Sequence, residues 1–76
     1  METMDVIYKC EDKAIDRLTI HYSKNRKEEV TPKIGDGFKK QQIVNGEIKI
    51  LTYRLKSVQS KANCYVCECN IESIED

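Results

Sequence analysis

The chain has 76 residues, of which 13 are basic and 13 acidic, and 39% are hydrophobic. This length accommodates one domain, residues 1–76, and the composition is that of a folded rather than a disordered protein. No apolar run approaches the roughly 20 residues of a membrane helix, and the acidic first five residues lack the features of a signal peptide. The sequence therefore predicts a small folded domain in the cytoplasm.

The charges are distributed unevenly along the chain. Residues 23–61 carry ten bases against four acids, whereas residues 1–22 and 62–76 are acidic. A basic middle segment can form a positive face for a polyanion, or it can be a solvated surface that keeps the protein soluble. Charge alone leaves both interpretations open.

The N-terminal third contains one clear strand and one ambiguous segment. Asp5–Cys10 alternates apolar and polar residues, which predicts a half-buried strand with Val6 on its inner face. Within residues 12–24, the alternation of Leu18–Tyr22 favours a strand, but Ile15 also falls at helical spacing from this segment. Because the segment is rich in β-branched residues and poor in strong helix formers, we predict a strand and keep the helix as the alternative.

The middle of the chain is polar and turn-rich. Ser23–Glu29 predicts a loop with room for one helical turn, and Gly35–Gly37 supplies a tight turn. Phe38–Val44 then predicts a strand of mixed polarity. Its run of lysine and glutamine side chains is typical of a sheet edge.

The dipeptide Asn45-Gly46 is the strongest local signal in the sequence. A two-residue type I′ turn needs positive φ at both positions, which asparagine tolerates and glycine adopts freely. The next strand, Glu47–Val58, has apolar residues in two phases, first at Ile48 and Ile50 and then at alternate residues of Leu51–Leu55. Such a change of phase predicts a β-bulge and a sharp bend, as in strands that close small barrels.

The C-terminal segment predicts a last strand at Cys64–Ile71, followed by an acidic tail at residues 72–76. Four sulfurs are the number that a structural zinc site uses. However, no glycine or proline bends the chain after Cys64, and in an extended strand this residue faces away from Cys67. We therefore interpret the thiols as small apolar core side chains, with no metal and no cofactor. The alternative is a zinc-stabilised module that uses Cys10, Cys64, Cys67 and Cys69.

No motif predicts catalysis. His21 is the only histidine and has no exposed thiol or orienting group assigned to it. The Gly35–Gly37 turn lacks the lysine and hydroxyl residues of a phosphate loop. Acidic pairs lie in polar loops, where their pKa values are not raised by burial. We expect no catalytic residues and no enzyme activity.

Basic side chains on the central hairpin form the candidate partner-binding surface. They lie on two strands that the Asn45-Gly46 turn joins, and one tyrosine accompanies them for stacking on a base. The candidate residues are Lys39, Lys40, Lys49, Tyr53, Arg54 and Lys56.

Together these elements predict a mostly β fold, a small five-stranded barrel or open roll of SH3-like architecture. The alternative is an α+β fold with one helix at residues 12–24 packed on a four-stranded antiparallel sheet. This expectation is one of architecture only.

Small barrels without a catalytic motif serve mainly as binding modules. We therefore expect a non-enzymatic binding or adaptor protein that docks a macromolecule, with a protein partner favoured over nucleic acid and no membrane partner. A homodimer through the edge strand is a further alternative. The composition, rich in Lys, Ile, Asn and Glu, is common in low-GC bacteria and their phages, where small accessory and inhibitor proteins are frequent.

Overall fold

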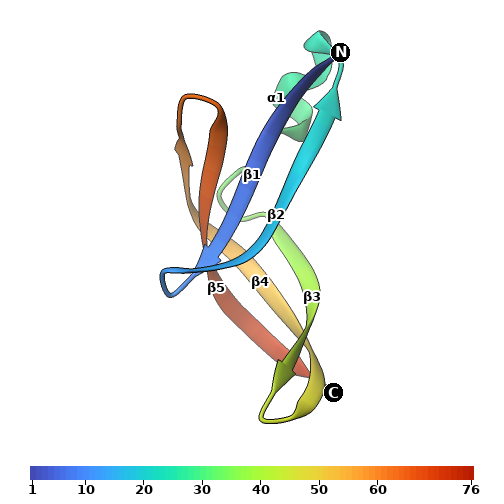
Figure 1. Ribbon diagram of the computed structural model, residues 1–76, viewed down its shortest axis with the longest axis vertical. Helices are drawn as coiled ribbons and strands as arrows, with labels where there is room; N and C mark the ends of the chain where they lie inside the picture. The colour runs from blue at the N-terminus through green and yellow to red at the C-terminus, as the bar shows by residue number, and fades with distance from the viewer.

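The computed structural model describes residues 1–76 and contains a single five-stranded sheet (Figure 1). Across the sheet the strands follow the order β2-β1-β5-β4-β3, so that β2 and β3 are its outer edges. The strands are β1 (Glu2–Cys10), β2 (Lys13–Tyr22), β3 (Gly37–Val44), β4 (Glu47–Ser60) and β5 (Cys64–Glu75). The mostly β prediction is therefore confirmed.

The first hairpin shows that residues 13–22 are a strand, so the alternative helix at residues 12–24 is wrong. β2 pairs antiparallel with the whole of β1, and this pairing places Ile20 opposite Met4 on the inner face. A register shift after Tyr8 leaves Ile15 as an extra residue in β2. Pairing with β1 satisfies the backbone groups of a segment whose own helix propensity is low.

A short helical segment lies between the two hairpins. η1 (Lys24–Arg26) and α1 (Lys27–Val30) form the single turn that the polar loop predicted. Val30 packs against the core beside the end of β2 (Figure 1). No helix of the structure has the length and apolar character needed to cross a membrane.

The Asn45-Gly46 hairpin forms as predicted. Both residues have positive φ, 52° and 83°, and Val44 pairs with Glu47 across the turn. β3 stays in one uninterrupted register with β4 from this turn to Gly37 and has no partner on its other side. The edge position predicted for Phe38–Val44 is confirmed.

The bend in β4 comes from a different place than the sequence predicted. Leu51, Tyr53 and Leu55 face inward as expected, but Ile48 is 68% exposed and faces outward with Ile50. The predicted change of phase between Ile50 and Leu51 is therefore wrong. The extra residue is Lys56, since Leu55 pairs with Cys69 and Ser57 with Glu68.

β5 is the central strand and is longer than predicted. It pairs parallel with β1 through residues 64–68 and antiparallel with β4 along most of its length. Residues 72–75 belong to this strand, so the segment predicted as a tail pairs with β4. Glu72 is the extra residue of a second irregularity, because Tyr53 pairs with Ile71 and Thr52 with Ser73.

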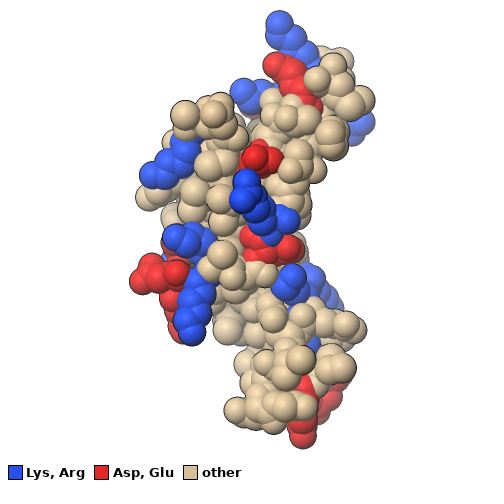
Figure 2. Space-filling view, viewed as in Figure 1, with Lys and Arg blue, Asp and Glu red and all other residues tan.

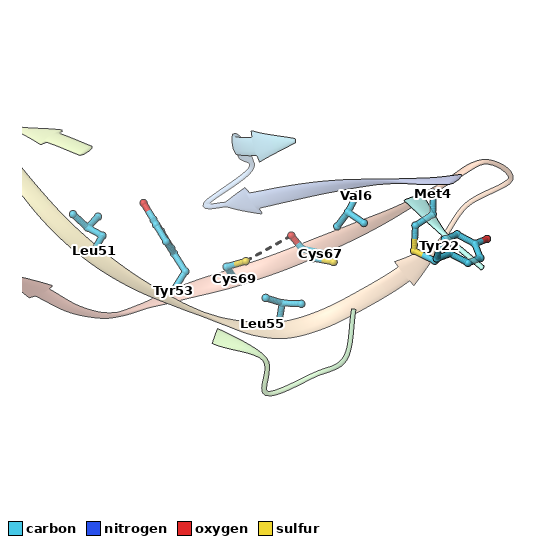
Figure 3. Close-up of a cluster of buried hydrophobic side chains, with 8 residues drawn as sticks. All are labelled: Met4, Val6, Tyr22, Leu51, Tyr53, Leu55, Cys67 and Cys69. Carbon is cyan, nitrogen blue, oxygen red and sulfur yellow. Dashed lines mark hydrogen bonds between the residues drawn. The ribbon is translucent and has the colours of Figure 1, made fainter. Parts of the chain in front are cut away.

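The core is a row of side chains along the inner face of the sheet (Figure 3). It runs from Met4 and Tyr22, near the open end of the β1–β2 hairpin, to Leu51, in the part of β4 that pairs with β3. Its fully buried members are Met4, Val6, Tyr22, Leu51, Tyr53, Leu55, Cys67 and Cys69.

The sheet curls into a half-barrel whose two edges approach through side chains. The rings of Tyr8 and Phe38, from β1 and β3, have centroids 4.7 Å apart. Lys40 of β3 reaches Asp16 of β2 at 3.7 Å. The edges share no strand pairing, so the fold is the open form of the predicted small roll.

Candidate interaction surface

The structure does not bring the six predicted basic-surface residues together on one face. Strand alternation places Lys39 and Arg54 on the outer face of the sheet, whereas Lys40, Lys49 and Tyr53 are on the inner face. Lys56 lies at the bulge of β4. In Figure 2, blue and red side chains are spread together along the length of the molecule and form no continuous blue ridge.

Three of these cations are held by carboxylates of the same chain, the first being Lys40, whose Nζ lies 3.7 Å from Asp16 Oδ1. Lys49 contacts both Glu47 and Asp76, and these hydrogen bonds, led by that to Asp76, raise the pKa of its ammonium group. Arg54 donates from Nε to Glu72 Oε2 at 2.6 Å, and this contact raises its pKa. Their charges are therefore largely balanced within the fold.

Arg54 also has a structural role. Its Nη1 donates to the carbonyl oxygen of Gly35 at 2.9 Å, which ties the turn before β3 to β4. The side chain passes so close to Gly37 that a Cβ at that position would lie 2.8 Å from Nη1. A side chain at position 37 would therefore require the Arg54 guanidinium to shift.

Tyr53 is a core residue. Only 2% of it is exposed, its ring stacks on Phe38 at 5.3 Å, and burial raises the pKa of its hydroxyl. Its ring is therefore not accessible to a nucleic-acid base. Among the six residues, Lys39 is the one that is exposed on the outer face without a carboxylate within 4 Å.

The most exposed apolar side chains of the sheet lie on the outer face of the β3–β4 hairpin. Ile43 is 76% exposed and pairs across the strands with Ile48, which is 68% exposed. Half-buried Ile50 continues the row on the same face. We call these three residues the hairpin patch. In Figure 2 the end of the molecule that holds this hairpin carries few charged side chains.

The hairpin patch was not predicted from the sequence, because Ile48 and Ile50 were expected to face inward. A signal was nevertheless present. The two-residue turn requires Val44 to pair with Glu47, and hence Ile43 with Ile48. Continuing the inward phase of Leu51–Leu55 back to the turn places Ile48 outside.

Cys67 and Cys69 are core residues, as predicted, and Cys10 packs against the core, whereas Cys64 is half-buried and outside it. Cys67 and Cys69 are buried, and the thiol of Cys69 points to the carbonyl oxygen of Cys67 at 3.9 Å (Figure 3). Burial, with a smaller contribution from Cys69, raises the pKa of Cys67 to about 11. All four cysteines are free, and no three side chains of metal-ligating type converge anywhere in the structure.

A cleft of about 600 Å³ lies beside the β1–β2 turn and includes Cys10 among its walls. Burial and then Glu11 raise the pKa of this thiol, which keeps it in the protonated, weakly nucleophilic form. His21 pairs with Thr3, at the opposite end of the hairpin from Cys10, so these two residues do not form a cysteine–histidine pair.

Comparisons with protein-family models, with curated proteins and with solved structures give no significant match to this chain.

Proposed function

We propose that this protein is a small non-enzymatic binding module that docks a protein partner on the β3–β4 hairpin. The observation that carries the proposal is the hairpin patch, where Ile43 and Ile48 face each other across the strands with most of their surface exposed. Contiguous exposed apolar side chains rimmed by polar residues are typical of protein interfaces. A protein partner explains the patch better than nucleic acid does, because three of the predicted cations are balanced by carboxylates of the same chain.

The size of the patch sets what the partner must provide. Full burial of two isoleucines contributes about 3–6 kcal/mol. Association of two proteins costs roughly 4–15 kcal/mol in lost freedom of motion. The patch is therefore the apolar centre of a larger contact, which also includes polar groups around it.

The four free thiols support a reducing, cytoplasmic setting for this function.

The test is affinity capture with three forms of the immobilised protein: the natural chain, the double variant Ile43→Ser/Ile48→Ser, and Ile34→Ser. Ile34 is the matched control, because it is an equally exposed isoleucine (69%) in the loop before β3. A specific partner should be retained by the natural chain and by Ile34→Ser, and reduced at least tenfold on the double variant.

Nuclease treatment of the lysate separates the two partner classes in the same experiment. A protein partner survives the treatment. Equal recovery on all three forms, or a loss of recovery after nuclease, would contradict docking of a protein on the hairpin patch.

A further inference from the structure

Four strand edges of the sheet lack a strand partner: β2, β3, the part of β4 beyond Arg54 on its β3 side, and the part of β5 beyond the end of β1. Three of them are irregular. β2 carries the extra residue Ile15, the free part of β4 carries the extra residue Lys56, and the free part of β5 carries the extra residue Glu72. β3 alone pairs with its neighbour in one uninterrupted register over eight residues. A regular, unbulged edge is the kind that accepts a further strand.

The turn determines which backbone groups of β3 face this edge. In a two-residue hairpin the carbonyl of the residue before the turn accepts the N–H of the residue after it, here Val44 and Glu47. Because hydrogen bonding alternates along an antiparallel pair, the backbone groups of Lys39, Gln41 and Ile43 point away from β4. Their side chains all lie on the outer face, the face of the hairpin patch.

A shallow hollow of about 330 Å³ lies on this edge, lined by Gln41, Gln42, Ile43 and Ile48. Added beside β3, a strand would fill it and extend the Ile43–Ile48 row by one side chain. It would also bring a side chain opposite Lys39, which has no carboxylate within 4 Å, whereas Lys40 is already paired with Asp16.

From this geometry we infer that the partner docks by adding a strand to β3, and that this strand carries apolar residues opposite Ile43 and Val44 and an acidic residue opposite the unpaired Lys39. The inference rests on the proposed function and names the chemistry of its partner. A second copy of this chain is less suited to the edge, because β3 contains no acid and a self-paired β3 gives neither copy of Lys39 a counter-charge.

The experiment is an NMR titration of the full chain with capped synthetic peptides. The acidic peptide has the core Ile-Val-Thr-Thr-Glu-Glu, which matches β3 in the antiparallel direction. A neutral peptide has Gln in place of Glu, and a basic peptide has Lys. We expect amide shifts centred on Lys39, Gln41 and Ile43, with the acidic peptide bound at least fivefold more tightly than the neutral one and the basic peptide weakest.

Charge reversal supplies the decisive variant. Lys39 is exposed and unpaired, so Lys39→Glu should keep the fold while inverting the order of the acidic and basic peptides. Lys13→Glu, on the other edge strand, is the matched control and should keep the original order. A dispersed NMR spectrum of each variant establishes that it is folded.

Several results would overturn the inference. These are equal affinity for the acidic and neutral peptides, shifts that map to β2 or β5, no shifts with any peptide, or a dimer of the protein alone whose β3 amides are protected. The proposed function is judged separately, by the capture experiment with the isoleucine variants. Suppose that the Ile43→Ser/Ile48→Ser variant loses the partner but the natural chain binds the acidic, neutral and basic peptides equally. The hairpin patch would then remain the binding site, and addition of an acidic strand would be rejected.

Discussion

The buried thiol of Cys67 links the stability of this protein to alkaline pH. Below its ordinary pKa of 9.0 the thiol is protonated in both the folded and the unfolded chain, and it contributes no pH dependence. Between that value and its folded-state pKa of about 11, only the unfolded chain ionises. The free energy of unfolding therefore falls as the pH rises through this window, by at most about 3 kcal/mol from this group.

Urea unfolding at pH 8 and pH 10.5 measures this loss. Cys67→Ala should reduce the difference between the two pH values without abolishing it, since burial also raises the pKa values of Cys69 and Tyr8. Cys64→Ala is the control and should leave the difference unchanged, because Cys64 lies on the other face of β5. An equal pH dependence in all three proteins would contradict the assignment.

The β1–β2 turn stores backbone strain at Glu11. Glu11 and Asp12 have φ of 53° and 64°, a region that residues other than glycine, asparagine and aspartate enter at a cost of about 1–2 kcal/mol. Glu11→Gly should therefore raise the stability by about 1 kcal/mol, which corresponds to roughly 4–8 °C in the melting temperature of a domain of this size.

The control for this turn is Gly46→Ala in the other hairpin. Gly46 has φ of 83°, and a Cβ added there would meet no neighbouring atom within 4 Å, so backbone strain alone should lower the stability by about 1 kcal/mol. Opposite shifts of the two melting temperatures are expected. A lower melting temperature for Glu11→Gly would show that the first turn is not strained.

At the scale of elements, local chemistry predicted most of the strands. The alternation around Val6 and the Asn45-Gly46 turn each carry a short-range signal that a single sequence contains. The parallel pairing of β1 with β5 does not, because it joins residues that are about sixty positions apart and has no local signature. The bulge at Lys56 has no local signature either: an exposed charged residue is compatible with a regular strand and with a bulge.

The interaction surface is harder to predict than the fold, and its residues show why. Charge is the signal that the sequence offers. However, Lys49 pairs with Asp76 and Arg54 with Glu72, and these carboxylates are distant from them in the sequence. The prediction that Ile48 faces inward also assumed that every apolar residue of β4 faces the core. That assumption fails at Ile48, because the hairpin projects beyond the core and both of its faces meet solvent.

The end of β5 provides a prediction at this scale. If residues 72–76 were a solvated tail, their removal would leave the stability unchanged. In the structure they supply Glu72 to Arg54, Asp76 to Lys49, and Ile74 opposite Leu51. Deletion of residues 72–76 should therefore lower the free energy of unfolding by more than about 1 kcal/mol.

Urea denaturation of the truncated chain measures this effect. The control is the full-length variant Glu75→Ser, which changes a charge of the same segment and keeps Glu72, Ile74 and Asp76. An unaltered unfolding midpoint after truncation would mean that residues 72–76 contribute nothing to the sheet.

At the scale of the whole molecule, the shape concentrates stability near the middle of the long axis. The protein measures 42 × 20 × 18 Å, with a radius of gyration of 13.5 Å, where a compact chain of this length has about 11 Å. Nine residues of 76 are buried, and the least exposed of them are Val6, Cys67 and Cys69. Val6 and Cys67 lie where β1 pairs with β5, and Cys69 pairs with Leu55 of β4. The β3–β4 hairpin projects from this centre (Figure 1).

Native-state hydrogen exchange should therefore show a gradient along the molecule. Amides of β5 near Cys67 and Cys69 are expected to exchange only through global unfolding, because their opening disrupts the core. Amides of β4 that bond to β3 near the tip, such as that of Glu47, should exchange through local opening with a much smaller free energy. Uniform protection from the centre to the tip would contradict this account.

The same gradient connects stability to binding. A ligand that binds only the closed hairpin stabilises it by mass action, in proportion to the logarithm of ligand concentration over Kd. Saturation with the acidic peptide should therefore slow exchange at the hairpin tip and at Lys39, Gln41 and Ile43, while the amides near Cys67 change much less. If the peptide instead protected the centre and left the tip unchanged, it would be bound to the core-bearing half of the sheet, and the hairpin would not be the docking element.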